Sequence, residues 1–343
     1  MTVSWPLPLV QAPMAGGASG PELAAAVSDA GGLGFLAAGY KTADATAADI
    51  TALRGRTDRP FGVNLFVPGE TSEAVATDEL PAYRTRLTAD ADRYGVALGD
   101  VPAHGIDDDW NAKVALLLDD PVPVVSFTFG CPATDLLAAF RDRGTLTAVT
   151  VTAPYEAGLA AAAGADLLVV QGTEAGAHQG RWDNTGPIGE PYGLLTLLAL
   201  VRELTGLPLI ATGGLMTGAQ VRAVLAAGAV AAQLGTAFLR CPESGAPAAH
   251  KAALADPRFG ETRLTRAFSG RPARGLVNAF VEAHSAEAPA AYPEIHYATA
   301  PIRRAAAAAD DPAAMALWAG QGWRLARAEP AADVVARVTA DLG

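Results

Sequence analysis

Residues 164–180 read GADLLVVQGTEAGAHQG, an apolar run followed by a glycine-spaced loop that carries a histidine. The run from Leu167 to Val170 is continuously apolar, which is the pattern of a parallel strand buried on both faces. It ends at Gln171-Gly172, and His178 lies in the loop beyond. In α/β barrels the reactive groups lie just past the C-terminal ends of such strands. The segment therefore predicts a buried parallel strand, with His178 in the place of an acid or base.

More apolar runs of strand length recur along the chain, and helix-like Ala- and Leu-rich segments such as 191–205 separate most of them. Alternating strands and helices predict a parallel sheet, and eight such units predict a closed (β/α)8 TIM barrel. An open doubly wound sheet is the alternative. The eight predicted strands are 7–14, 33–38, 61–67, 122–130, 146–152, 166–171, 207–212 and 230–239.

Two segments interrupt the repeat. Residues 69–113, between the third and fourth strands, are acidic and polar and look like a helical insertion, whereas 241–343 form an Ala- and Pro-containing tail with helical patches. We predict that 1–68 and 114–240 form the barrel, and that the insertion and the tail form a smaller, mostly helical domain over the substrate. The run Asp107-Asp108-Asp109 is interpreted as a solvated loop or helix cap, because the paired ligands of a metal site are missing.

Composition narrows the function classes. Half of the 343 residues are hydrophobic, and the net charge of -11 argues against nucleic acid and anionic membranes as partners. Cys131 and Cys241 stand alone, so they make neither a disulfide framework nor a zinc pattern, and a reduced cytoplasmic setting is expected. Neither a signal peptide at Met1–Val10 nor an apolar run of transmembrane length is expected.

Glycines end the seventh and eighth predicted strands, in the segments Ala211-Thr212-Gly213-Gly214 and Gln233-Leu234-Gly235-Thr236. The loops after these two strands are the usual phosphate site of a (β/α)8 barrel. Glycine lets the backbone N–H groups approach a phosphate closely, and the Thr236 hydroxyl can add a donor. Glycine also ends strands for steric reasons alone. The prediction of a phosphate site therefore rests on the presence of glycines at both expected positions.

Three amides lie near strand ends: Asn64, Gln171 and Gln233. A buried amide must find partners, so these side chains either tie strands together or contact a ligand. A flavin ring offers donors and acceptors that match amides. Met14, after the first strand, would then pack against a flat ring, although core filling is its alternative role.

His178 can act as a general base near neutral pH, or it can be a structural histidine with satisfied hydrogen bonds. Glu174 could orient it or could cap a helix. Other chemistries fit poorly, because the strand ends lack a Schiff-base lysine and lack clusters of His and carboxylate ligands. The GxSxG and GxGxxG motifs are absent as well.

Taken together, these motifs resemble the nitronate monooxygenase family, formerly called 2-nitropropane dioxygenases, and within it the class I branch. The resemblance runs from about residue 8 to about residue 325. The matching segments are QAPMAGG (11–17), GGLGFLAAGY (31–40), FGVNLFVPG (61–69), VVSFTFGCP (124–132), VVQGTEAGAHQG (169–180), ATGGL (211–215), QLGTAFLRCPES (233–244) and LWAGQ (317–321).

The resemblance implies an FMN-binding barrel that oxidises alkyl nitronates with O2 to a carbonyl compound and nitrite. Propionate 3-nitronate, a toxic nitro acid, is typical of the branch, so detoxification is the implied role. His178 would be the base that takes the α-proton of a neutral nitroalkane. The residues implied around FMN are Asn64, Gln171, Gly176, Gly213 and Gln233, Leu234, Gly235 and Thr236; Gly214 joins them from the phosphate argument, and no metal is implied.

The chain departs from the family where relatives commonly read AGGH, because Ala177 replaces the second glycine. A methyl group there tightens the loop if its φ is positive. Two other functions stay open: an FMN-dependent NAD(P)H:quinone or enoyl reductase on the same barrel, and a barrel that binds a phosphate ligand without redox chemistry. Tyr292, Tyr297 and Trp318 of the tail are candidates to line the pocket.

Overall fold

The computed structural model describes residues 5–69, 78–188, 192–340 and 342. Its centre is a parallel barrel whose strands pair in chain order, with β9 returning to β1. A bridge between Val10 and Leu33 closes the ring, since Gln11 donates its backbone N–H to Leu33. The TIM barrel prediction is thus confirmed. The strands are β1 (Leu9–Gln11), β2 (Gly34–Ala37), β3 (Phe61–Phe66), β4 (Val124–Thr128), β5 (Leu146–Val151), β6 (Leu167–Gln171), β8 (Leu209–Thr212) and β9 (Ala231–Leu234).

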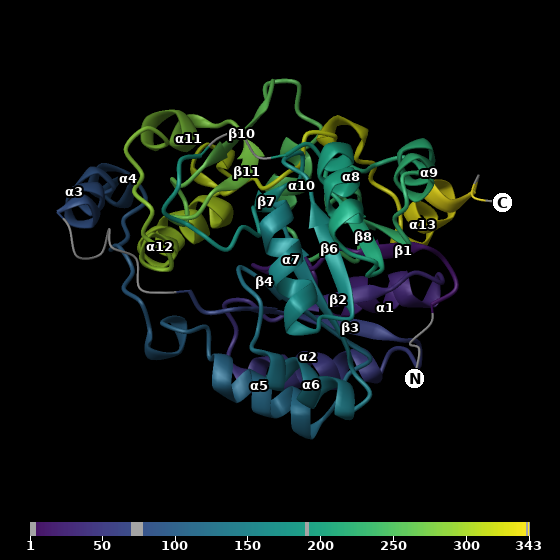
Figure 1. Cartoon of the computed structure of the whole chain (residues 1–343). Coiled ribbons are helices and arrows are strands. Elements are labelled where there is room, and N and C mark those ends of the chain that lie inside the picture. Colours follow the sequence, from purple (N-terminus) through teal and green to yellow (C-terminus); the bar gives the residue numbers. More distant parts are fainter. Residues whose placement is uncertain (1–4, 70–77, 189–191, 341, 343) are drawn as a thin grey trace.

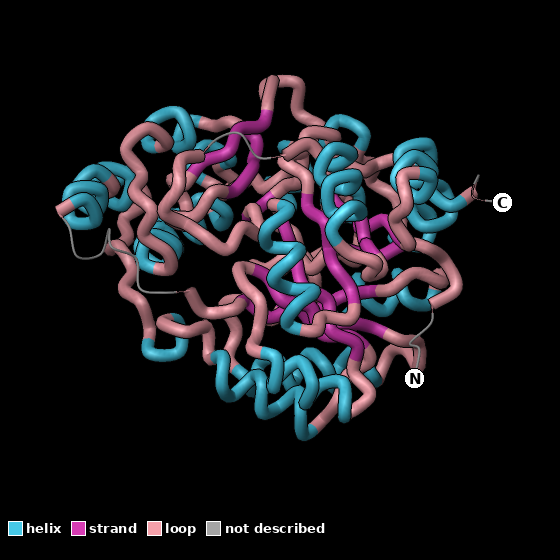
Figure 2. Tube along the Cα trace, in the orientation of Figure 1, coloured by secondary structure: helices cyan, strands magenta, loops and turns pink. Residues whose placement is uncertain are grey.

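Helices surround these strands (Figure 2), and the last helix of the ring comes from the far end of the chain. Helix α13 packs against α1 and α9, so it occupies the place that follows β9 in the barrel. The long segment between β9 and α13 is therefore an excursion out of the barrel. The helices of the ring are α1 (Pro21–Asp29), α2 (Ala43–Arg54), α5 (Trp110–Asp119), α6 (Thr134–Asp142), α7 (Pro154–Ala163), α8 (Leu194–Leu204), α9 (Gly218–Ala226) and α13 (Ala331–Thr339).

The barrel interior changes character along its axis. Apolar side chains fill one part of it, among them Val10, Phe35 and Ile210. Near the C-terminal ends of the strands the buried residues turn polar, as at Asn64 and Thr150. Buried polar groups need partners, so this end of the barrel is where a ligand or a polar network is expected.

A smaller lobe covers that end, and it has its own core. Its apolar cluster joins Tyr83 of the insertion to Phe268, Phe280 and Ile295 of the tail. Figure 1 shows α3 and α4 beside α11 and α12, on one side of the barrel. The helices of this lobe are α3 (Glu79–Arg86), α4 (Thr88–Arg93), α10 (Ala248–Ala253), α11 (Ala279–His284) and α12 (Glu294–Ala308).

A small antiparallel sheet, which the sequence did not predict, joins lobe and barrel. It orders β10 (Thr262–Thr265), β11 (Ala273–Leu276) and β7 (Ala177–His178). His178 thus lies in a short strand paired with the tail, and not in a free loop as predicted. The division at residue 240 stays a prediction, although α13 within 241–343 packs on the barrel.

Candidate functional site

A cavity of about 470 Å³ opens at the C-terminal ends of the strands, between the barrel and the lobe. Small-molecule and cofactor sites commonly measure about 300–1,000 Å³. Leu234 is the exception among the predicted residues, since its side chain is buried in the layer between strands and helices. The other predicted residues all line the cavity: Asn64, Gln171, Gly176, His178, Gly213, Gly214, Gln233, Gly235 and Thr236.

His178 faces the cavity from an aromatic surround. The centroid of its ring lies 5.7 Å from that of Phe129, 6.0 Å from Tyr292 and 5.8 Å from Trp318. Strand pairing with Ala273 fixes its backbone. The carbonyl of His178 also accepts a hydrogen bond from the Gln171 amide at 3.2 Å, which anchors the short strand to β6.

The hydrogen bonds around Ser269 assign the tautomer of His178. The Ser269 hydroxyl donates to the Arg271 carbonyl at 3.1 Å, so its oxygen is left to accept. His178 Nε2 lies 2.9 Å from that oxygen and therefore carries the proton. The other ring nitrogen of a neutral imidazole is then an acceptor. Nδ1 has no partner among the described residues, and it is the available basic atom.

The pKa of His178 falls from 6.5 to about 3, because the ring is desolvated and the cations of Arg271 and Arg303 repel its charged form. Arg271 is itself buried, with its guanidinium 4.0 Å above the Phe129 ring. In the free protein the imidazole is thus neutral at every ordinary pH, which is the state that a base requires.

Glu174 does not orient the histidine. Its carboxylate accepts the backbone N–H of Leu194 at 3.0 Å and so caps the start of α8. Gln171 acts as a tie, since its carbonyl oxygen accepts the Gly180 N–H at 2.7 Å while its nitrogen holds His178. Glu174 is therefore a helix cap and not the residue that orients His178. Gln171 ties β6 to the segment 178–180 at the cavity wall.

One end of the cavity presents unused backbone donors. The N–H groups of Gly213, Gly214, Gly235 and Thr236 have no acceptor among the residues that the structure describes. Gly213 and Gly214 both have positive φ, +129° and +68°. Successive backbone N–H groups without acceptors at the wall of a cavity are the feature from which anion sites are built. The Thr236 oxygen accepts the Gly320 N–H at 3.0 Å, so its own proton is free to be donated.

Amides mark the walls of the barrel mouth. The Asn64 nitrogen is 2.9 Å from Ser126 Oγ and 3.0 Å from Thr128 Oγ1, which leaves its oxygen available. Gln233 makes no side-chain hydrogen bond within the described ranges, although it is only 8% exposed. Met14 also lines this part of the cavity. A flat polar-edged ring would satisfy the amides and pack against the thioether.

Non-glycine residues with positive φ gather at the cavity: Tyr40 (67°), Phe129 (79°) and Ala177 (59°). A side chain in this conformation is strained, and such strain concentrates at functional sites. The φ of Ala177 is thus positive, as the expected tightening of the loop requires, and this residue has a left-handed backbone conformation. Gly176 is needed for space, since a Cβ there would lie 2.5 Å from the Gly320 nitrogen.

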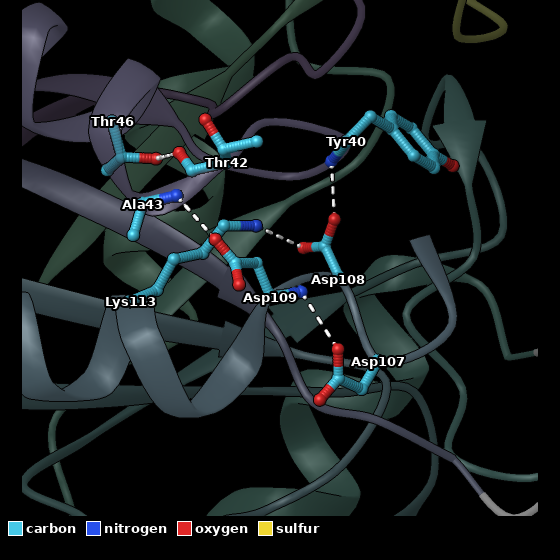
Figure 3. Close-up of polar contacts among 8 residues, drawn as sticks. All are labelled: Tyr40, Thr42, Ala43, Thr46, Asp107, Asp108, Asp109 and Lys113. Atoms are coloured by element: carbon cyan, nitrogen blue, oxygen red, sulfur yellow. Dashed lines mark hydrogen bonds and ion pairs between the residues drawn. The ribbon is translucent and has the colours of Figure 1, made fainter. Parts of the chain in front are cut away.

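The aspartate run holds Tyr40 in this conformation (Figure 3). Asp108 accepts the Tyr40 N–H at 2.6 Å and pairs with the buried Lys113 ammonium at 2.8 Å. Asp109 accepts the Ala43 N–H at 2.7 Å. The helix-cap interpretation of Asp107–109 holds for Asp109, whose carboxylate caps the start of α2 rather than its own helix α5. The solvated-loop alternative does not describe Asp108, whose side chain is only 14% exposed and is paired with Lys113. We call Asp108, Asp109 and Lys113 the aspartate clamp.

The tail supplies cavity residues that the sequence did not indicate. Of the three aromatic candidates, Trp318 lines the cavity, Tyr292 packs on His178, and Tyr297 packs instead near Gly99 and Gly105. The polar tail residues missed are His250, Ser269, His296, Arg303 and Arg304, and Tyr40 and Phe129 of the barrel loops were missed as well. Only Tyr40 and Phe129 stood inside a family-like segment.

The nitronate monooxygenase family model matches residues 3–341. The chain belongs to the nitronate monooxygenase family. It is 40% identical to a nitronate monooxygenase of Pseudomonas aeruginosa over 98% of this chain and 96% of the relative. A nitronate monooxygenase of Paraburkholderia phytofirmans is 38% identical, over 98% and 92% of the two chains.

Solved structures agree with this assignment. The nitroalkane oxidase from Streptomyces ansochromogenes is 56% identical, with a TM-score of 0.94 over 98% of this chain and 96% of that one. FabK from Thermotoga maritima is 26% identical, with a TM-score of 0.75 over 98% and 93%. As a family member the chain is an oxidoreductase. Among its described residues no helix is both long and apolar enough to span a bilayer.

Proposed function

We propose that the protein is an FMN-dependent nitronate monooxygenase that oxidises alkyl nitronates, such as propionate 3-nitronate, with O2 to a carbonyl compound and nitrite. The observation that carries the proposal is a neutral histidine with a free Nδ1 beside a cavity that presents unused N–H donors. The family name of the relatives supplies the substrate class. A cytoplasmic location is part of the proposal, since both cysteines are free thiols.

The residues present fit FMN. The orphan N–H groups at Gly213, Gly214, Gly235 and Thr236 would hold the phosphate, and Asn64 and Gln233 would hold the ring edge. Leu234 would contribute through position alone, because its side chain faces the helices. Gln171 and Gly176 would shape the wall beside the ring. When bound, FMN would supply the two-electron acceptor and the reaction with O2.

His178 performs the step that the protein itself can catalyse. Its Nδ1 accepts the α-proton of a neutral nitroalkane, which gives the nitronate, while Nε2 stays bonded to Ser269. The aromatic surround of Phe129, Tyr292 and Trp318 excludes water from the carbanion. A nitronate that is already formed has no such proton to lose, so it needs only binding and orientation.

The deciding experiment is an anaerobic absorption spectrum of the purified protein before and after propionate 3-nitronate is added without NAD(P)H. We expect a yellow flavin spectrum that is reduced by the nitronate alone. Reduction only after NADH would move the assignment to the reductase alternative. A colourless protein that takes up no FMN would overturn the cofactor and favour a barrel for another phosphate ligand.

A further inference from the structure

Two neutral histidines line the same cavity from different elements. His178 belongs to β7 and His296 to α12. Burial and the cation of Arg303 hold the pKa of His296 well below 6.5, and a charge on His178 lowers it further. The two imidazoles are therefore close enough to interact electrostatically. Because the pKa of His178 is lowered as well, both rings are neutral at ordinary pH.

A hydrogen bond from Arg303 assigns the tautomer of His296. A guanidinium can only donate, and Arg303 Nη2 lies 3.4 Å from His296 Nδ1. Nδ1 is therefore the acceptor of the ring, and in a neutral imidazole the proton is then on Nε2. The same Nη2 donates to the His296 carbonyl at 2.7 Å, which fixes the guanidinium beside the ring. Nε2–H has no acceptor among the residues that the structure describes.

His178 has the opposite polarity. Its Nε2 proton is bonded to Ser269, so it presents the acceptor Nδ1 to the cavity, whereas His296 presents a donor. One cavity thus combines a neutral acceptor with a neutral donor. Removal of a proton from a carbon next to a nitro group benefits from both, because the base takes the proton while negative charge moves onto the nitro oxygens.

The ring of His296 is held in a fixed orientation. It stacks on Tyr40 with centroids 3.7 Å apart and planes 7° apart, and Tyr297 packs against it at 84° with centroids 5.0 Å apart. Tyr40 is in turn held by Asp108, which accepts its backbone N–H (Figure 3). The aspartate clamp and Arg303 thus fix the donor in advance, and preorganised donors are the ones that stabilise the charge of a transition state.

Other polar side chains around His178 are less suited to this task. The Ser269 hydroxyl already donates to a backbone carbonyl, and the Tyr40 hydroxyl has almost no accessible surface. Arg303 uses two of its three nitrogens for bonds within α12 itself. The indole N–H of Trp318 also has no acceptor among the described residues, so it is the alternative donor that the test must separate.

We infer that His296 is a second catalytic residue, whose Nε2–H donates to an oxygen of the nitro group while His178 Nδ1 takes the α-proton. The C–H bond breaks, its electron pair forms the C=N bond of the nitronate, and the N–O π electrons move onto the oxygen that His296 contacts. His296 keeps its own proton throughout. The inference rests on the proposed function and extends it to the nitro group, which every substrate of this class carries.

The test uses nitroethane and its preformed nitronate, which carry no second functional group. H296F keeps a ring to stack on Tyr40 but removes the donor. We expect kcat for nitroethane to fall about 100-fold, as when an oxyanion donor is removed. The nitronate is charged before it binds, so for this form KM should rise about ten-fold with kcat nearly unchanged. H296Q places an amide N–H near the position of Nε2 and should recover most of both losses.

H284F is the matched control, because His284 is another buried histidine of the lobe that packs against an aromatic ring but does not line the cavity. It should leave both kinetic constants nearly unchanged. Wild-type kinetics in H296F, or equal losses in H296F and H296Q, would overturn the inference. The same losses in W318F but not in H296F would assign the donor to Trp318 instead. If the wild-type protein oxidises neither form, the proposed function itself fails.

Infrared spectroscopy tests the same contact without turnover. 2-Methyl-2-nitropropane has a nitro group but no α-proton, so it can bind without reacting. A hydrogen bond to a nitro oxygen lowers the N–O stretching frequency. We expect the frequency of the bound compound to be lower in the wild-type protein and in H284F than in H296F. Equal frequencies in wild type and H296F would overturn the inference, whatever the kinetics show.

Discussion

At the scale of single residues, the state of His178 decides the chemistry. H178N removes the basic atom but keeps a polar side chain of similar size. We expect turnover of neutral nitroalkanes to fall by ~10²–10⁴-fold, the usual contribution of a general base. Preformed nitronates should lose much less, because they have no α-proton to give up. Initial rates on both forms of one nitroalkane measure the ratio, and equal losses would contradict a basic role.

Ser269 acts on the reaction through His178, as a positioning residue. S269A removes the oxygen that accepts the Nε2 proton, so the ring loses its fixed tautomer. We expect kcat for a neutral nitroalkane to fall about ten-fold, with little change for the nitronate. S269T keeps a hydroxyl and should restore most of the rate. A uniform loss on both substrates in S269A would indicate a packing defect instead.

Ala177 carries a cost that a glycine would avoid. Its φ of 59° places a Cβ in the left-handed region, where L-residues are strained by roughly 1–2 kcal/mol. Replacing Ala177 with glycine removes this strain, but the greater entropy of glycine in the unfolded chain offsets part of the stabilisation. A177G should therefore raise the free energy of unfolding by about 0.5–1 kcal/mol in urea titrations. A161G, in the ordinary helix α7, should lower it by about 1 kcal/mol, and a loss in both variants would contradict the argument.

At the scale of elements, the aspartate clamp joins α5 to the loop that carries Tyr40. K113M leaves the Asp108 carboxylate buried without its partner. Breaking such a pair from one side costs about 3–5 kcal/mol, so we expect a loss of that size in urea unfolding. The double variant K113M/D108N should recover part of it, because the uncompensated charge is gone. Additive losses in the two single variants would show that the pair does not act as a unit.

The elements of the fold differ in how well the local sequence predicts them. The strands of the barrel were predictable because each is a continuous apolar run. The residues at the C-terminal ends of these strands could therefore be predicted to line the cavity. β7, by contrast, spans only Ala177–His178, and it exists because β11 pairs with it from far along the chain. Arg303 and Ser269 reach the cavity by packing of the lobe, which no local pattern encodes. The packing of α13 on the barrel could not be foreseen, because the long segment between β9 and α13 interrupts the barrel repeat.

At the scale of the whole molecule, three buried histidines make stability depend on pH. Burial lowers the pKa of His178 to about 3 and of His250 to about 4, and burial together with the Arg303 charge holds that of His296 well below 6.5. All three bind a proton near pH 6.5 once the chain unfolds. Between pH 6.5 and 4 the unfolded state thus takes up more protons, so stability must fall as pH falls.

Asp108 works in the opposite direction. Burial raises the pKa of its carboxyl to about 6, so between pH 6 and 3.8 the folded state is the one that binds the extra proton. Three histidines against one aspartate leave a net proton uptake on unfolding that grows as the pH falls and averages about 1.5 protons between pH 7 and pH 5.5. At about 1.4 kcal/mol per proton and pH unit, the free energy of unfolding should drop by about 3 kcal/mol from pH 7 to pH 5.5.

Urea titrations at pH 7 and pH 5.5 measure this drop, and H250Q isolates one of its sources. His250 lies at the cavity and bonds the Trp318 carbonyl at 3.0 Å. Replacing it should reduce the drop by about a third, whatever it does to stability at pH 7, because one of three proton uptakes disappears. A wild-type protein whose stability is flat over this range would mean that these histidines titrate normally. The neutral His178 on which the proposed chemistry depends would then be lost as well.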